Sequence, residues 1–457
     1  MSLGFGLGVD RVRLPQGGSA TPWLPGTEEN AIFAFDTIEF GASGLWADLA
    51  KTTPASEGGD VYVIENEIDN AVGDAVLITG RTPAKLINGS LRFRQDSVYS
   101  IDTSSLGTLN MNAMTMTMIG GFTNLGAKYA LVNQSDSQIM GITTVGAPVE
   151  SYCKSHGQID AIFHNQLDSP IFFGFCPGGG AVKHRMGHQT ATLSASTSLT
   201  FTSVAFGGRS TGSYAFPGAI YGLALYAEDF GATKLTTHND WHNARARQDV
   251  YLVCNGDSIT NGTTVVESNS WDLPYPQTLG ERLFTDYSVA AWGVNTGVGG
   301  ATALNMRDNA SAQVDALYKS GFSTYVNTIC GGTNDYFYGT TDPSVVAGYI
   351  WEWCAARRAF LEAQGVPSAS IIIGVTTQID RDVATAYKTF LDDLNGIIRD
   401  NWSTYADVLI DPESDAHFSI SLDASTNTTY YTDGTHPTAA GHAILADIFA
   451  AALGPLL

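Results

Sequence analysis

A serine stands where its hydroxyl could do chemistry, directly after a run of apolar residues. Residues 250–254 are almost continuously apolar and predict a buried strand, which is followed by Gly256, Asp257 and Ser258. A serine in a tight turn after a strand presents its hydroxyl at the edge of a sheet, beside the N–H groups of a starting helix. Gly-Asp-Ser is also an ordinary turn sequence, so the serine needs partners elsewhere in the chain.

Two later segments could supply hydrogen-bond donors. The stretch from Asn295 to Gly300 is rich in glycine, which lets the backbone come close to a ligand. It lacks the Lys-Ser/Thr of a phosphate-binding loop and follows the second predicted strand rather than the first. Asn334 follows the third predicted strand, where its amide could donate to an oxyanion or merely cap a turn.

An aspartate and a histidine come just before the last predicted helix. Asp433 precedes His436 by three residues and could reach its Nδ1 atom if the backbone between them curls. Such a contact selects one ring tautomer and leaves Nε2 able to take a proton. The alternative is an aspartate that caps the helix and a solvated histidine.

Strands and helices that alternate would place these four segments at one edge of a sheet. Near-continuous apolar strands are typical of parallel sheets buried on both faces, so residues 246–457 predict a three-layer α/β/α domain around five parallel strands. The active site of such a domain lies at the carboxyl ends of its strands. We expect strands near 250–254, 287–291, 325–330, 370–375 and 407–410, and helices near 274–285, 311–320, 343–364, 381–404 and 437–453.

The four segments, in this order, resemble the conserved blocks of SGNH (GDSL-like) hydrolases. The resemblance covers about 200 residues and implies a serine ester hydrolase that needs no metal or organic cofactor. It makes Ser258 the nucleophile, His436 the general base and Asp433 the residue that orients the histidine.

The same resemblance implies three donors for an oxyanion hole: the N–H groups of Ser258 and Gly300 and the side-chain amide of Asn334. Gly300 is preferred to Gly299 because the family spacing Asn-x-Gly-x-x-Gly begins at Asn295. The neighbouring glycine leaves that choice open by one residue.

Substrate-pocket residues are expected around the same edge of the sheet. Asp257 precedes the serine, and Tyr336 and Phe337 follow the asparagine segment. The two aromatic residues could equally be packing residues of the core. A polar insertion at 412–432 could also help to form the pocket.

The first half of the chain has another pattern. Residues 31–245 show short alternating runs separated by Gly, Asn and Ser, which predict an all-β sandwich. The run at 218–226 followed by a polar helix resembles the end of concanavalin A-like (laminin-G-like) jelly rolls. That resemblance implies either a glycan-binding module, with a structural calcium ion in some members, or a positioning module. Residues 1–30 are rich in Gly and Pro and predict an extended arm.

Composition restricts the partners. The net charge is −22, from 45 acidic and 23 basic residues, which disfavours nucleic acid and anionic lipid surfaces. No run approaches the 18 apolar residues of a membrane span, and the first residues do not form a Sec signal peptide. The five cysteines include no CxxC pair, so neither a disulfide framework nor a zinc site is indicated.

These observations lead to two hypotheses about the whole chain. The first is an esterase that removes O-acetyl groups from an acylated carbohydrate, with a lipase or thioesterase for longer acyl chains as its alternative. The second is a structural or adhesive bacteriophage tail-associated protein with auxiliary esterase activity, which would assemble into a virion or a homo-oligomer. Its basis is the Gly-rich start without a signal peptide, and it implies an extracellular or virion-associated location.

Overall fold

The fold is described from a computed structural model. It describes residues 28–457 apart from 41, 69–71, 88–89, 94–95, 111–113, 123–130, 134–138, 145–148, 154–161, 164–170, 177–180, 187–188, 195–199, 202, 208–217, 246, 264, 266–272, 380–384 and 419–426.

The second half of the chain is built on a five-stranded sheet whose neighbouring strands all pair in parallel, as the sequence predicted. The strand order β22-β21-β23-β24-β25 means that the chain starts near the middle, moves to one edge and then returns past its start. The strands are β21 (Val250–Gly256), β22 (Trp292–Asn295), β23 (Thr324–Cys330), β24 (Ile371–Thr376) and β25 (Val408–Ile410).

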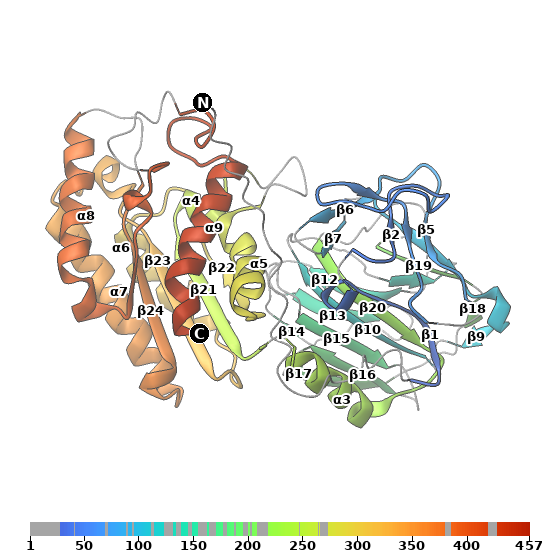
Figure 1. Cartoon of the computed structure of the whole chain (residues 1–457). Helices are drawn as coiled ribbons and strands as arrows, with labels where there is room; N and C mark the ends of the chain where they lie inside the picture. The colour runs from blue at the N-terminus through green and yellow to red at the C-terminus, as the bar shows by residue number, and fades with distance from the viewer. Residues whose placement is uncertain are drawn as a thin grey trace.

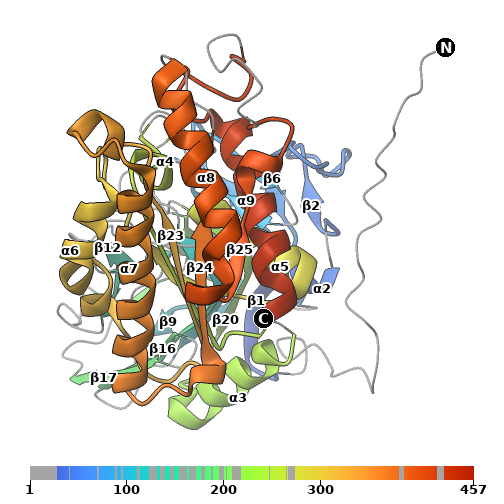
Figure 2. The same ribbon diagram turned by 90° about the vertical axis from the view of Figure 1, so that its left-hand side faces the viewer.

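Helices cover both faces of this sheet, as Figures 1 and 2 show. Side chains alternate along β21: Val250, Leu252 and Cys254 belong to one apolar cluster, whereas Tyr251 and Val253 belong to another. The first cluster includes residues of α5 (Tyr275–Tyr287) and α9 (Ala439–Leu453). The second includes residues of α6 (Ala303–Gln313), α7 (Pro343–Ala363) and α8 (Thr385–Tyr405). The domain therefore has the three layers that the apolar strands predicted.

Two predicted elements are displaced in the structure. The strand expected at 287–291 begins only at Trp292, because α5 continues to Tyr287 and ends at Ser288, whose φ of 58° is left-handed. The helix expected at 311–320 begins earlier, at Ala303, where Thr302 and Asn305 form a capping box. Polar residues on α6 hide this start from a reading based on apolar periodicity.

One helix with its following residues, 439–456, is the single described stretch long and apolar enough to be considered for a membrane span. The sequence shows no unbroken apolar run here because His442 and Asp447 interrupt it. In the structure α9 packs against α5 and β25, and Leu445, Phe449 and Leu453 are buried. Its apolar character is thus accounted for by core packing.

The first half of the chain contains two antiparallel nine-stranded sheets. Phe33 and Phe35 of one sheet approach Phe206 of the other, with ring centroids 6.5 and 6.2 Å apart, so the two sheets share a core. The region is therefore mostly sheet, and its jelly-roll topology remains a prediction.

The first sheet contains β3 (Asp60–Val61), β6 (Ala84–Ile87), β7 (Ser90–Arg92), β20 (Gly218–Tyr226), β10 (Thr115–Phe122), β15 (Ile171–Cys176), β16 (Ala181–Met186) and β17 (Gln189–Ser194), with β1 (Ala31–Asp36) beside β20. The second contains β2 (Leu45–Trp46), β4 (Val63–Ile64), β5 (Ala75–Leu77), β8 (Tyr99–Asp102), β19 (Ser203–Phe206), β11 (Leu131–Asn133), β12 (Ile139–Thr144), β13 (Val149–Cys153) and β14 (Ile162–Phe163).

The all-β region contacts the α/β domain directly (Figure 1). Arg92 of β7 forms a buried ion pair with Glu281 of α5 at 2.8 Å. Beside it the rings of Tyr221 and Phe284 meet edge to face at 5.8 Å. These contacts fix the β-sheet region against the helix that follows the serine segment.

Candidate active site

Ser258 lies at the carboxyl end of β21, as the first residue of the short helix α4 (Ser258–Asn261). Asp257 caps this helix by accepting a hydrogen bond from the N–H of Ile259 at 2.9 Å. The turn requires glycine at position 256, because a Cβ atom there would lie 2.0 Å from the hydroxyl of Thr260 and 2.8 Å from the carbonyl oxygen of Cys330. Close packing of the strand end against α4 thus determines where the serine stands.

His436 lies within hydrogen-bond distance of this serine although 178 positions separate the two residues. Its Nε2 atom is 2.9 Å from the Ser258 hydroxyl, and its Nδ1 atom is 2.8 Å from a carboxylate oxygen of Asp433. The other carboxylate oxygen of Asp433 accepts the backbone N–H groups of Thr435 and His436. The structure therefore brings the three residues together in the order Ser–His–Asp.

The Asp433 carboxyl is held in its charged form. Burial raises its pKa, but the hydrogen bonds and charge of His436 outweigh burial, so the pKa is lowered overall. A carboxylate can only accept hydrogen bonds, so Nδ1 of His436 donates to it. Nε2 is then the atom that can accept the proton of the Ser258 hydroxyl.

Asn334 lies between the segments that carry the other two predicted oxyanion donors. Its side-chain nitrogen donates to the carbonyl of Ala301 at 3.0 Å and lies 3.5 Å from a carboxylate oxygen of Asp257. Ala301 follows Gly300, and Asp257 precedes Ser258. The three predicted donors are therefore neighbours at the carboxyl ends of β21, β22 and β23.

The glycine segment after β22 packs directly on α4. Asn295 donates to the carbonyl of Thr260 at 2.7 Å and accepts the N–H of Gly297 at 2.9 Å. Gly300 has a left-handed φ of 75°, and a Cβ atom on it would lie 3.5 Å from the Tyr338 hydroxyl. Gly299 is exposed, whereas Gly300 is half-buried near the Tyr338 hydroxyl, which favours Gly300 as the predicted donor.

The three predicted pocket residues differ in their burial. Asp257 is completely buried, and its carboxylate caps α4, so it supports the serine turn. Tyr336 is half-buried and turns toward Tyr387 and Phe390, with ring centroids 5.4 and 5.5 Å away. Phe337 is half exposed, and its ring lies 4.7 Å from that of Tyr387.

Tyr338 is the last residue of the aromatic run that the sequence offered as a pocket candidate. It is 71% exposed, and its hydroxyl reaches the Gly300 segment. It belongs to the 3-10 helix η5 (Asp335–Tyr338), in which successive side chains point in different directions. The only signal in the sequence was the aromatic run itself, which does not tell which ring faces outward.

The polar insertion at 412–432 is described except for 419–426. Its Asp415 and His417 lie 2.7 Å apart and form a separate pair beside the ring of Tyr430. Among the described residues, no group of three or more His, Cys, Asp or Glu side chains is arranged to hold a metal ion. No site for the calcium ion implied by the jelly-roll resemblance can therefore be named among them.

Comparisons with known proteins agree with this geometry at the level of the family. Residues 254–444 match the model of the GDSL-like Lipase/Acylhydrolase family, which spans the serine, glycine, asparagine and aspartate–histidine segments. No curated protein matches the chain by sequence.

Several solved structures are similar over less than half of the chain. A member of the lipolytic protein G-D-S-L family from Veillonella parvula is 19% identical, with a TM-score of 0.32 over 44% of this chain and 95% of its own. An acetylxylan esterase from Geobacillus stearothermophilus is 20% identical, with a TM-score of 0.32 over 44% and 92%. A psychrotrophic esterase from Pseudoalteromonas sp. is 12% identical, with a TM-score of 0.33 over 45% and 97%. By the family match, residues 254–444 form a GDSL-like lipase/acylhydrolase domain.

Proposed function

We propose that the chain hydrolyses esters through an acyl-enzyme on Ser258. The observation that carries the proposal is the 2.9 Å contact between the serine hydroxyl and Nε2 of His436, whose other nitrogen contacts Asp433. A serine hydroxyl is a weak nucleophile until a neighbouring base removes its proton. Here the base is His436, in the tautomer whose Nε2 atom can accept the proton of the serine hydroxyl.

The reaction begins when Ser258 attacks the ester carbonyl and His436 takes the hydroxyl proton. The carbonyl oxygen becomes an oxyanion, and the N–H groups of Ser258 and Gly300 and the amide of Asn334 stabilise it. Each such donor contributes roughly 3 kcal/mol in measured oxyanion holes. When the tetrahedral intermediate collapses, His436 returns the proton to the leaving alcohol.

The acyl-enzyme is then hydrolysed by the same residues. His436 takes a proton from water, the resulting hydroxide attacks the acyl carbon, and the acid leaves as Ser258 regains its proton. Asp433 stays ionised throughout and stabilises the imidazolium ring that forms in each half of the reaction.

We further propose that the substrate is an O-acetylated carbohydrate. Tyr338, whose hydroxyl lies near Gly300, exposes 71% of its surface, and its neighbour in sequence, Phe337, exposes 50%. Exposed aromatic faces are suited to stacking on sugar rings, whereas a site for long acyl chains needs a deep apolar groove. In this proposal the β-sheet region of residues 31–245 positions or binds the glycan.

The test compares acetyl, butyryl and octanoyl esters of p-nitrophenol and then an acetylated polysaccharide. We expect turnover to fall as the acyl chain lengthens, and acetate to be released from the polysaccharide. Preference for octanoyl esters would contradict the sugar-acetyl proposal and favour a lipase or thioesterase.

Ser258→Ala should abolish turnover, whereas Ser104→Ala, at an exposed serine of the β-sheet region, should not. Activity that survives Ser258→Ala would contradict the assignment of the nucleophile.

A further inference from the structure

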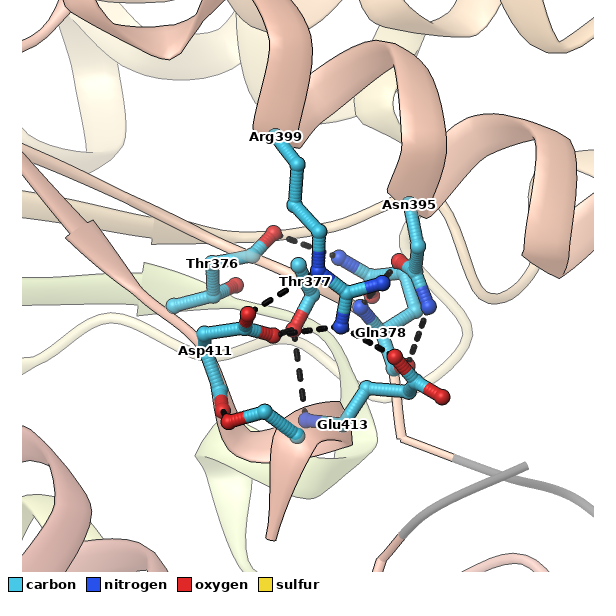
Figure 3. Close-up of polar contacts among 8 residues, drawn as sticks. Thr376, Thr377, Gln378, Asn395, Arg399, Asp411 and Glu413 are labelled. Atoms are coloured by element: carbon cyan, nitrogen blue, oxygen red, sulfur yellow. Dashed lines mark hydrogen bonds and ion pairs between the residues drawn. The ribbon is translucent and has the colours of Figure 1, made fainter. Parts of the chain in front are cut away.

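The chain segment after β24 is held by helix α8 rather than by another strand. The N–H of Gln378 donates to the side-chain oxygen of Asn395 at 2.7 Å, and the side-chain nitrogen of Asn395 donates back to the carbonyl of Gln378 at 2.9 Å. One amide side chain thus satisfies both backbone groups of Gln378 beyond the end of the sheet, as Figure 3 shows.

A second set of contacts fixes the residue before Gln378. The Thr377 hydroxyl donates to Asp411 at 2.7 Å, and Asp411 accepts two hydrogen bonds from Arg399 (Figure 3). Asn395 and Arg399 are four positions apart on α8, so the same helix face holds both contacts. The segment 376–378 is therefore clamped between α8 and the end of β25.

The side chain of Gln378 extends from this clamped segment to the turn that carries Asn334. Its side-chain oxygen accepts a hydrogen bond from the Thr333 hydroxyl at 2.9 Å. The carbonyl of Thr333 accepts a second bond from the Tyr387 hydroxyl at 2.7 Å. Gln378, Thr333 and Tyr387 are all at most 3% exposed.

The backbone of this turn has little freedom of its own. Gly332 has a φ of 125°, and a Cβ atom on it would lie 2.7 Å from Leu394 of α8. The residue directly before Asn334 is thus held by hydrogen bonds to its side chain and its carbonyl, on a turn already packed against α8. None of these contacts touches Ser258 or His436.

We propose that Gln378 and Thr333 are positioning residues for the oxyanion donor Asn334. The inference rests on the proposed function, in which the Asn334 amide stabilises the oxyanion. An oxyanion donor acts only within a narrow range of geometry, and a displacement of about 1 Å can cost on the order of 100-fold in rate. The buried Thr333–Gln378 bond prevents that displacement.

The first experiment removes the bond from either side and measures kcat and KM with p-nitrophenyl acetate. Thr333→Val and Gln378→Met keep the size of the side chains, and each should lower kcat about 10-fold while KM changes less than about twofold. Thr333→Ser retains the hydroxyl and should restore kcat. The control is Thr324→Val at the opposite end of β23, which loses a hydroxyl bonded to Arg247 and should keep the wild-type kcat.

The second experiment combines each substitution with Asn334→Ala. If Gln378 and Thr333 act through Asn334, the double variants should be no more than about twofold slower than Asn334→Ala alone. Losses that multiply, or a kcat of Thr333→Val equal to that of Thr324→Val, would overturn the inference while leaving the oxyanion role intact. An Asn334→Ala variant with wild-type kcat would overturn the oxyanion role and this inference together.

Discussion

At the scale of single residues, Asp433 decides which nitrogen of His436 faces the serine. Its carboxylate accepts from Nδ1 and from two backbone N–H groups, so it fixes both the tautomer and the ring. Asp433→Asn should lower kcat by on the order of 100-fold or more, because an amide can donate to Nδ1 and reverse the tautomer. Stopped-flow or steady-state rates with p-nitrophenyl acetate would measure this loss, and circular dichroism should show an unchanged fold. A variant with nearly wild-type kcat would mean that the histidine is oriented by other contacts.

A second histidine in the same part of the chain has a different role. His442 is buried on α9, its Nδ1 accepts the N–H of Tyr275 at 3.2 Å, and burial lowers its pKa from 6.5 to about 3. The unfolded chain therefore takes up this proton first as the pH falls. The stability that neutral His442 contributes is complete above about pH 6.5 and is lost progressively toward pH 3.

This titration predicts a measurable difference between variants. Between pH 7 and pH 4.5 the free energy of unfolding of the wild type should fall by about 2 kcal/mol more than that of His442→Gln. Urea denaturation at both pH values would measure the difference. Equal pH dependence in His442→Gln and the wild type would show that His442 is not the group responsible.

At the scale of elements, the position of α4 depends on the glycine segment that packs on it. A Cβ atom on Gly297 would lie 2.3 Å from the backbone nitrogen of Asn261 and 2.7 Å from the carbonyl carbon of Thr260. Gly297→Ala should therefore push α4, and with it Ser258, away from His436. We expect kcat to fall at least 10-fold and the free energy of unfolding to fall by about 1–3 kcal/mol.

The matched control for this substitution is Gly348→Ala in the middle of α7. A Cβ atom at Gly348 would have no neighbour within 4 Å, and alanine favours helices, so this variant should be as stable as the wild type or slightly more. A Gly297→Ala enzyme with wild-type kcat would show that α4 tolerates displacement and that the glycine segment does not position the serine.

At the scale of the whole molecule, one buried ion pair joins the β-sheet region to the α/β domain. Arg92 and Glu281 are 2.8 Å apart, with side chains 5% and 1% exposed. Glu281→Gln removes the carboxylate that balances a buried guanidinium, and such a change costs about 3–5 kcal/mol. Replacing both residues, as Arg92→Met with Glu281→Leu, should recover most of this loss, because no buried charge then remains.

The adjacent residue provides the control for this prediction. Arg282 pairs with Asp447 at 2.6 Å, but the Asp447 side chain is 57% exposed, so Arg282→Gln should cost less than about 1 kcal/mol. Guanidinium denaturation followed by tryptophan fluorescence would compare the variants. If Glu281→Gln were as stable as Arg282→Gln, the ion pair would not hold the two regions together.

Much of the α/β domain could be predicted because its signals are local. Apolar runs predicted five parallel strands, and the segments around Ser258, Gly300, Asn334 and His436 fell at strand ends or before the last helix. The limits of α5 and α6 could not be predicted as well, because caps and polar helix faces are weak signals in one sequence.

The sequence by itself determined which chemical groups are available: a serine, a histidine and a carboxylate. It also placed them at segment ends that a parallel sheet brings together at one edge. Only the tertiary structure decided that Asp257 is a buried support, that Tyr336 faces inward while Tyr338 faces out, and that Gln378 reaches Thr333. The physical reason is that residue type and spacing act along the chain, whereas burial and side-chain direction depend on packing between segments far apart in sequence. The proposed nucleophile could therefore be named from its motif, but the contacts that hold its surroundings in place could not.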